Sequence, residues 1–355
     1  MYASIVAVEY HLPGHVIGND EVAQLAPNWT ADKILQKTGI AERHVAADTE
    51  CSSDLAFHAA EKLFQSGVCS REEIDFILFC TQSPDYLLPT SACLLQDRLK
   101  LRTGIGALDF NLGCSGYIYG LGLAQGLIET GQAKTVLFLT GETYSKFLRE
   151  GDVGVRSLFG DAGSATLIRA VESDRPLFGP YVYGTDGKGA ENLILKRHSL
   201  RTEGDLPQGT ACGAQVGETV ALDSGAATAT DSSGSENFLY MNGPEIFSFA
   251  LDAVPRAVNE LLSRAQLALH DIDLFVFHQA NEFMLNRLKS KLQIPDDRFV
   301  LALKEYGNTV SSTIPIALQT VLADGRLKLG MQVMLVGFGV GYSWGAMLLR
   351  VPVKS

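Results

Sequence analysis

The chain contains EIDFILFC at residues 73–80 and, 198 positions later, DIDLFVFH at residues 271–278. Both stretches are almost continuously apolar after their acidic starts, as strands buried on both faces are. Each follows a segment with the apolar spacing of an amphipathic helix, residues 54–66 in the first case and 249–265 in the second. The two halves of the chain therefore share a helix-and-strand pattern.

The similarity continues beyond these strands. Residues 134–141 (KTVLFLTG) resemble residues 331–337 (MQVMLVG) at an offset of 197. A helical segment that ends at Gly131 is matched, at an offset of 194, by one that ends at Gly325. Similarity at a nearly constant offset through three elements indicates an internal duplication.

The repeated unit predicts the fold class. Each half is expected to form strand–helix–strand–helix–strand, and right-handed crossovers place helices on both faces of a mostly parallel sheet. We therefore expect an α/β protein of two duplicated halves, residues 1–175 and 176–355, in a layered α/β/α/β/α arrangement. The linker is expected within residues 170–186. An irregular, polar stretch at residues 201–236 is interpreted as a surface excursion or, alternatively, as a flap over a binding pocket.

The duplication also predicts which polar residues meet. At the offset of 194, Cys114 falls on Asn308, and at the offset of 198, Cys80 falls on His278. Cys114 and Asn308 should therefore occupy equivalent helix starts in opposite halves, and His278 should end a core strand. A pseudo-twofold axis would bring these positions together where the halves join.

Cys114 lies in DFNLGCSGY, residues 109–117, between an apolar strand-like segment at 106–110 and a helical pattern at 117–129. The cysteine is therefore expected at a helix N-terminus, where unpaired N–H groups and the helix dipole favour a thiolate. Taken alone, it could equally be a small buried cysteine in a glycine-rich turn.

Composition excludes several classes of protein. With 355 residues, 46% of them hydrophobic, and a net charge of −11, the chain is globular and unsuited to nucleic acid or an anionic membrane surface. The start of the chain does not resemble a signal peptide, and no apolar run is long enough for a membrane span. Six cysteines without C-x-x-C pairs favour a reducing cytoplasm and predict no metal site. Arg287, Lys289 and Lys291 form either a docking patch for an acidic partner or a solvated helix face.

Cys114, His278 and Asn308 together suit acyl transfer. Alone, His278 would be a core histidine, Asn308 a helix cap, and the segment GFGVGYSWGA at residues 337–346 a tight hairpin. Together, the cysteine can attack a thioester carbonyl, and backbone N–H groups of Cys114 and of the glycine-rich segment can receive the oxyanion. His278 and Asn308 can both donate hydrogen bonds to a developing negative charge.

Four motifs carry a resemblance to a known family. They are NLGCSG at 111–116, HQAN at 278–281, YGNT at 306–309 and GFGVGYSWG at 337–345. In this order they resemble the β-ketoacyl-acyl-carrier-protein synthase III family, whose members have the thiolase fold. Three further segments agree with it: 37–43, 159–163 and 241–247.

The resemblance implies a two-step reaction. Cys114 takes an acyl group from acyl-CoA or an acyl carrier protein, and a malonyl thioester then loses CO₂ to give an enolate that His278 and Asn308 stabilise. The enolate attacks the acyl-enzyme, and the backbone N–H groups of Cys114 and Val340 hold the oxyanion. No cofactor is implied beyond the phosphopantetheine arm of the substrates.

The resemblance also implies an assembly and a set of binding residues. The family forms cytoplasmic homodimers, in which the segment around Leu88 lines the partner's acyl pocket. The substrate-binding positions carried over from the family are Leu88, Phe247, Asn281, Gly339 and Gly341. The positions carried over for docking of CoA or carrier protein are Lys37, Arg156, Arg287, Lys289 and Lys291.

The substrate-binding positions depart from those of acetyl-CoA-using members. Lys33 and Lys37 replace the tryptophan and arginine that clamp the CoA adenine, Val153 replaces an arginine, and Phe283 replaces an arginine linked to carrier docking. The family's pocket-gating aromatic is Leu88 here, and Pro244 replaces a common asparagine. We therefore expect a specialised relative in lipid, polyketide or secondary-metabolite synthesis. The alternatives are an initiating enzyme of fatty-acid synthesis, acyl transfer to a hydroxyl or amine, and a non-catalytic partner subunit.

Overall fold

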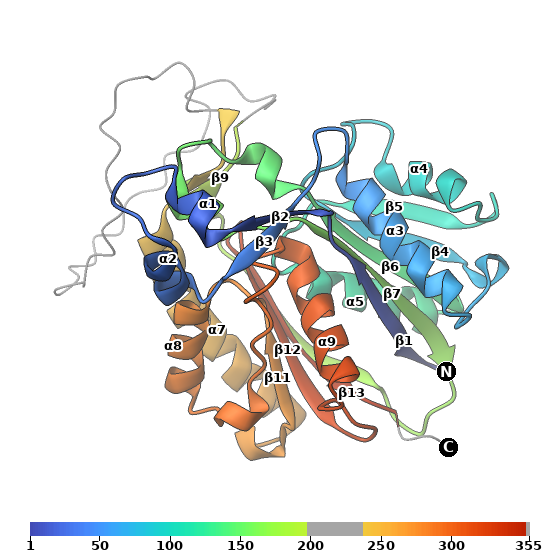
Figure 1. The fold of residues 1–355 in the computed structure, drawn as a ribbon. Coiled ribbons are helices and arrows are strands. Elements are labelled where there is room, and N and C mark those ends of the chain that lie inside the picture. Colours follow the sequence, from blue (N-terminus) through green and yellow to red (C-terminus); the bar gives the residue numbers. More distant parts are fainter. Residues whose placement is uncertain (197–236, 353–355) are drawn as a thin grey trace.

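The computed structural model describes residues 1–196 and 237–352, and the expected excursion at 201–236 lies outside the described residues. Two sheets alternate with three layers of helices (Figure 1). This α/β/α/β/α arrangement was predicted from the duplication. No helix within the described ranges combines the length and the apolar character needed to cross a membrane.

The first sheet has five strands. In spatial order they are β1 (Tyr2–His11), β7 (Ala162–Val171), β6 (Thr135–Glu142), β4 (Phe76–Cys80) and β5 (Gly106–Phe110). The strands β4, β5 and β6 are parallel, whereas β7 is antiparallel to both β6 and β1.

The second sheet has four strands. They are β11 (Leu274–Phe277), β12 (Gln332–Gly339), β13 (Ser343–Arg350) and β8 (Phe178–Thr185). β11 and β12 are parallel, and the other two pairings are antiparallel. In each sheet all strands but one run in the same direction, as expected of mostly parallel sheets: β7 is the reversed strand of the first sheet and β13 that of the second. The connection from β7 of the first sheet to β8 of the second, residues 172–177, lies within the range 170–186 expected to contain the linker.

Each helix layer buries apolar side chains against a sheet. α3 (Ser52–Gln65) and α4 (Ser91–Arg98) cover the outer face of the first sheet, and α7 (Gly243–Ala265) and α8 (Glu282–Leu292) lie outside the second. α5 (Gly116–Glu129) and α9 (Thr313–Ala323) lie between the sheets. Buried residues of this central layer, such as Leu121 and Val321, share one core with strands of both sheets.

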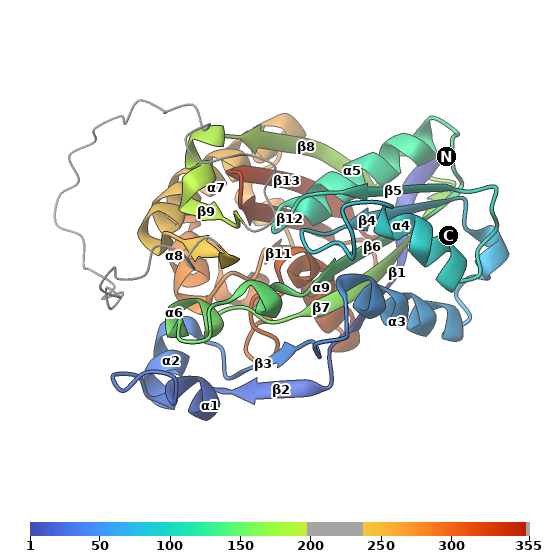
Figure 2. The same ribbon diagram turned by 90° about the horizontal axis from the view of Figure 1, so that it is seen from above.

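Shorter elements form a lobe at one side of the layers (Figure 2). They are β2 (His15–Gly18), α1 (Asn19–Ala23), α2 (Ala31–Thr38), β3 (Glu42–Val45), α6 (Val153–Arg156), β9 (Leu193–Ile194) and β10 (Tyr240–Met241). The buried Arg43 of β3 ties this lobe together, because its guanidinium donates to the carbonyl oxygens of Ile17 and Ser157 and to Oδ1 of Asn19.

The register of the two sheets repeats the offsets seen in the sequence. Phe79 pairs with Leu139 in the first sheet, and Phe277, 198 positions after Phe79, pairs with Val336 in the second. α5 ends at Glu129 and α9 at Ala323, which reproduces the offset of 194. The fifth strand of the first sheet, β5, is matched in the described part of the second half by one parallel bridge between Phe275 and Phe299.

Candidate active site

Cys114 lies in the turn between β5 and α5. Ser115 is the N-cap residue of α5, and the N–H of Gly116 donates to the carbonyl oxygen of Gly113 (2.8 Å). The cysteine is only 7% exposed. Gly116 is required at this place, because a Cβ there would overlap Sγ of Cys80. The strand–turn–helix expected around Cys114 is thus present.

The hairpin between β12 and β13 brings bare backbone against this turn. A Cβ on Gly337 would lie 2.7 Å from the carbonyl oxygen of Cys114, and a Cβ on Gly339 would lie 3.0 Å from its Sγ. Val340 follows in the turn and packs with the apolar cluster that contains Cys114. Gly341 adopts φ = +139°, which a residue with a Cβ rarely takes. The segment is therefore a hairpin, and its backbone lies close to the thiol of Cys114.

His278 follows the last residue of β11 and is held from two sides. Its backbone N–H donates to the carbonyl oxygen of Val336 (2.7 Å), and its Nδ1 lies 2.7 Å from Oγ1 of Thr313 in α9. Burial lowers the pKa of His278 to about 3, partly opposed by the Val310 carbonyl. The imidazole is therefore neutral at pH 7. The single proton of the Thr313 hydroxyl lies within reach of both Nδ1 and the Val310 carbonyl oxygen. When it is donated to Nδ1, Nε2 carries the imidazole proton and is a hydrogen-bond donor.

Asn308 presents the donor end of its amide. Gly307 before it adopts φ = +68°, and the N–H of Asn308 donates to the carbonyl oxygen of Leu158 (2.8 Å). Its Oδ1 accepts from the N–H of Val310 (3.0 Å). Because the oxygen is occupied and Nδ2 makes no hydrogen bond within the described residues, the NH₂ group is available to a ligand.

Val310 connects the three polar residues. It adopts φ = +55°, and its Cγ1 would lie 3.0 Å from a Cβ on Gly113, the residue before Cys114. Its N–H donates to Oδ1 of Asn308, and its carbonyl oxygen lies 3.0 Å from Oγ1 of Thr313, which also contacts Nδ1 of His278. The segments that carry Cys114, His278 and Asn308 therefore converge on one buried residue, as the pseudo-twofold argument predicted.

The electrostatics of Cys114 differ from the expectation for a helix N-terminus. Burial raises the pKa of the thiol above its usual range, and the nearby Glu142 carboxyl raises it further. The N–H groups of the helix start do not outweigh this loss of solvation. In the absence of substrate the side chain is therefore a thiol at neutral pH.

The substrate-binding residues expected from the family differ in exposure and in the groups they contact. Leu88 is 83% exposed, beside Leu87. Phe247 stacks on Phe283, with ring centroids 5.4 Å apart, and Oδ1 of Asn281 caps α8 by accepting from the N–H of Met284 (2.8 Å).

The basic docking residues are also distinct from one another. Lys289 pairs with Asp296 (2.6 Å), and Nζ of Lys291 donates to the carbonyl oxygen of Leu251 (2.8 Å). Arg156 ends the short helix α6 and is half-buried. Nζ of Lys37 lies 5.1 Å from the ring centroid of Trp29, as does Nζ of Lys33.

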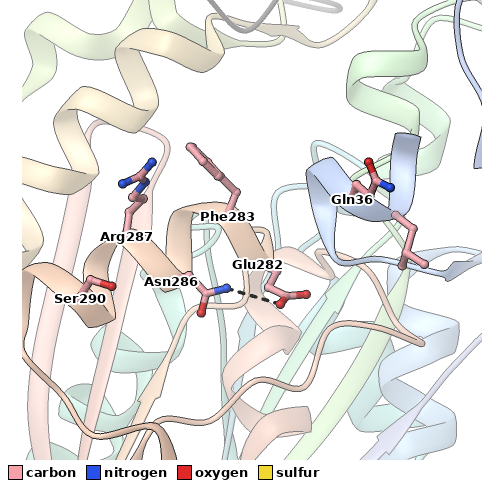
Figure 3. Close-up of a pocket in the computed structure, with 7 residues that line it drawn as sticks. Gln36, Glu282, Phe283, Asn286, Arg287 and Ser290 are labelled. Carbon is pink, nitrogen blue, oxygen red and sulfur yellow. Dashed lines mark hydrogen bonds between the residues drawn. The ribbon is translucent and has the colours of Figure 1, made fainter. Parts of the chain in front are cut away.

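Arg287 lines a cavity of about 450 Å³ between α2 and α8 (Figure 3). The guanidinium lies over the ring of Phe283, 5.3 Å from its centroid. The other lining residues are Leu35, Gln36, Glu282, Asn286 and Ser290. The three basic residues of α8 therefore do not form one patch, and only Arg287 lines this cavity.

Sequence reasoning missed three residues of the site. Thr313 and Val310 could have been suspected from their places beside Asn308, although nothing in their types points to a role. Glu142 gave no signal, because it ends an apolar strand as an acidic residue at a surface turn would. No group of three or more His, Cys, Asp or Glu side chains within residues 1–196 and 237–352 is arranged to hold a metal ion.

Comparison with known proteins identifies the family. Residues 108–187 match the family model of 3-oxoacyl-[acyl-carrier-protein] synthase III, and residues 262–351 match that of its C-terminal part. The chain is 33% identical to a β-ketoacyl-[acyl-carrier-protein] synthase III of Xanthomonas oryzae pv. oryzae, with 99% of this chain and 98% of the relative covered. It is also 33% identical to one of Clostridium perfringens, with coverage of 98% and 99%.

Solved structures agree over the whole length. A crystal structure of a 3-oxoacyl-(acyl-carrier-protein) synthase III matches with a TM-score of 0.89 at 50% identity and covers 99% of this chain and 100% of its own. The Thermus thermophilus enzyme matches with a TM-score of 0.84 at 34% identity, with 98% of each chain covered. The thiolase-like fold, the acyltransferase class and the resemblance stated from the motifs are confirmed: the chain belongs to the 3-oxoacyl-(acyl-carrier-protein) synthase III family.

Proposed function

We propose that the protein loads an acyl group from an acyl thioester onto Cys114 and condenses it with a malonyl thioester, with loss of CO₂, to give a β-ketoacyl product. The observation that carries this proposal is the convergence of the segments of Cys114, His278 and Asn308 on Val310, with the backbone of Gly339 against Cys114. Family membership over the full length supports the same reaction.

The geometry suggests a role for each residue. The sulfur of Cys114 attacks the acyl thioester, and the N–H groups of Cys114 and Val340 receive the oxyanion. The carbon–sulfur bond of the donor then breaks, and the donor leaves as a thiol with the proton that Cys114 gives up. The malonyl thioester then binds with its carbonyl oxygen toward Nε2 of His278 and the amide NH₂ of Asn308. Both donors are neutral and buried, so each can donate a hydrogen bond to the enolate without first breaking an ion pair. The enolate carbon attacks the acyl group, and the thiolate of Cys114 leaves.

We further propose that the acyl group is not acetyl, as in a specialised relative in lipid, polyketide or secondary-metabolite synthesis. The thiol lies in a cluster of large apolar side chains. These are Tyr144, Leu148, Val155, Phe159, Leu193, Leu239 and Val310. Lys33 and Lys37 both lie against Trp29, so the residues at the positions of the adenine clamp differ from those of acetyl-CoA-using members. The cavity at Arg287 is the proposed place for the polar arm or the carrier of the donor.

The exposed apolar segment at Leu87 and Leu88 supports a homodimer, because two adjacent leucines more than four-fifths exposed are unfavourable in water. We propose that this segment contributes to the partner's acyl site, in a cytoplasmic enzyme that needs no bound cofactor.

Intact-protein mass spectrometry tests the reaction. The protein is incubated with a panel of acyl-CoAs and acyl carrier proteins, and then chased with malonyl carrier protein while CO₂ is measured. We expect an acyl adduct that disappears only with the malonyl donor. Cys114→Ala should carry no adduct, whereas the exposed Cys93→Ala should behave as the parent. An adduct that hydroxyl or amine acceptors discharge, without CO₂, would replace condensation by simple acyl transfer.

A further inference from the structure

A buried carboxyl group near Cys114 takes no part in the reaction described above. Glu142 is the last residue of β6 and is 0% exposed. It forms no ion pair with any basic side chain of residues 1–196 and 237–352. An unpaired, buried carboxylate is unfavourable, so its presence calls for a reason.

Hydrogen bonds join Glu142 to both loops of the site. Oε2 accepts from the N–H of Gln82 (3.1 Å) and from the hydroxyl of Ser83 (3.2 Å), in the loop after β4. Oε1 accepts from the hydroxyl of Ser311 (2.8 Å), three residues after Asn308. The carboxyl therefore connects the loop after β4 to the loop that carries Asn308.

The first of these loops reaches the nucleophile turn. Oε1 of Gln82 packs against Gly113 so closely that a Cβ there would overlap it, and this oxygen accepts from the hydroxyl of Tyr144 (2.6 Å). Gln82 therefore contacts both Glu142, through its backbone N–H, and the residue before Cys114, through its side chain.

The titratable groups that face Glu142 are two thiols, a phenol and a carboxyl. They are Cys80 at the end of β4, Cys114, Tyr144, and Asp161 before β7. Burial raises the pKa of Glu142 to about 8, against the hydrogen bonds from Ser311, Gln82 and Ser83 that favour the anion. The ionised carboxyl raises the pKa of Cys114 in turn. Two anions in this interior repel each other strongly.

We propose that Glu142 is a positioning residue that holds its proton while Cys114 acts: the neutral acid permits the thiolate, and its ionisation suppresses acylation at alkaline pH. This rests on Cys114 being the nucleophile of the proposed function. The reactivity of the thiol toward a simple alkylating reagent can nevertheless be measured whether or not condensation occurs.

The test compares Glu142→Gln with the parent protein. The amide has the shape of the acid, can accept from Gln82, and carries no charge. The rate of alkylation of Cys114 by iodoacetamide is followed between pH 6 and 10 by intact-protein mass spectrometry. We expect similar rates below about pH 7 and, above about pH 8, a rate about tenfold higher in Glu142→Gln, equivalent to about one unit in the thiol pKa. Superimposable profiles would overturn the proposal.

Ser311→Ala provides a second variant, which keeps the carboxyl. It removes one hydrogen bond to the anion, so Glu142 should ionise at higher pH and the suppression of alkylation should begin at higher pH. Suppression at an unchanged or lower pH would contradict the proposal. Asp161→Asn removes a buried carboxyl that accepts from the N–H groups of Ala46 and Ser145 and that raises the pKa of Glu142. The suppression should persist in this variant and begin at lower pH, the opposite direction from Ser311→Ala.

Thermal unfolding gives a readout that is independent of the thiol. Because the pKa of Glu142 rises from 4.5 to about 8 on folding, its contribution to stability is fully present below pH 4.5 and is lost as pH rises through 8. The Tm of the parent should therefore fall relative to that of Glu142→Gln between pH 5 and pH 9. A constant difference in Tm would mean that Glu142 does not titrate in this window and would refute the mechanism.

Discussion

The ends of β6 and β12 occupy equivalent places in the two halves, but their last residues differ in chemical character. β6 ends at Glu142 and β12 at Gly339, an offset of 197. Glu142 supplies a buried carboxyl group, whereas Gly339 supplies bare backbone against Sγ of Cys114. The helix starts also differ: one carries Cys114, the proposed nucleophile, and the other the amide of Asn308. The duplicated scaffold thus supplies matching positions, and the two halves fill them with different side chains.

Away from these ends, the halves have kept the same hydrogen bonds. Oδ2 of Asp75 accepts from the N–H groups of Lys134 and Thr135, and Oδ2 of Asp273, 198 positions later, accepts from the N–H of Gln332. Both aspartates fix the start of a central parallel strand. The strand starts therefore keep similar contacts in the two halves, while the strand ends carry different residues with different contacts.

The largest effect on the reaction rate is expected from a substitution in the C-terminal half. Asn308→Ala should slow malonyl decarboxylation by about 10²–10³-fold, the scale for one lost oxyanion donor, while acylation of Cys114 stays nearly intact. The two half-reactions are measured separately, by CO₂ release and by mass spectrometry. Equal loss in both would show that Asn308 holds the loop at Val310 rather than the enolate.

Gly339→Ala changes the residue of the second half that corresponds to Glu142 of the first. The added Cβ would lie 2.8 Å from Cβ of Cys114 and 3.0 Å from its Sγ, so the nucleophile must shift. Acylation should fall by about 10²-fold, as expected when a reacting atom moves by about 1 Å. Gly126→Ala, where a Cβ meets open space, is the control and should leave the acylation rate unchanged. An active Gly339→Ala would mean that the hairpin does not position the thiol.

Thr313 tests how the imidazole is oriented. Thr313→Val keeps the shape but removes the hydroxyl at Nδ1 of His278, so the tautomer that donates from Nε2 is no longer favoured. Decarboxylation should fall by about 10-fold or more, and Thr313→Ser should restore it. A loss that serine does not rescue would indicate a packing role.

The sequence was sufficient to predict the strands and helices that repeat and the residues that lie in known motifs. The buried strands, the central helices and the positions of Cys114, His278 and Asn308 follow from periodicity and offset. The strands β1, β7 and β8 were missed because they fall outside the repeated pattern. Glu142 and Thr313 were missed for another reason. Their roles depend on burial and on partners distant along the chain, such as Gln82 and His278, which no local pattern reveals.

The smallest effects should come from the conserved aspartates, and they measure how alike the halves remain. Asp75→Ala leaves two N–H groups without their acceptor and breaks the contact with Arg102 (2.9 Å), whereas Asp273→Ala frees one N–H. Each unsatisfied group costs about 1–3 kcal/mol when buried and less when partly exposed, as here. Urea unfolding should therefore show a greater loss for Asp75→Ala than for Asp273→Ala. The reverse order would mean that the strand starts have also diverged, and that the similarity of the halves lies in their backbone path alone.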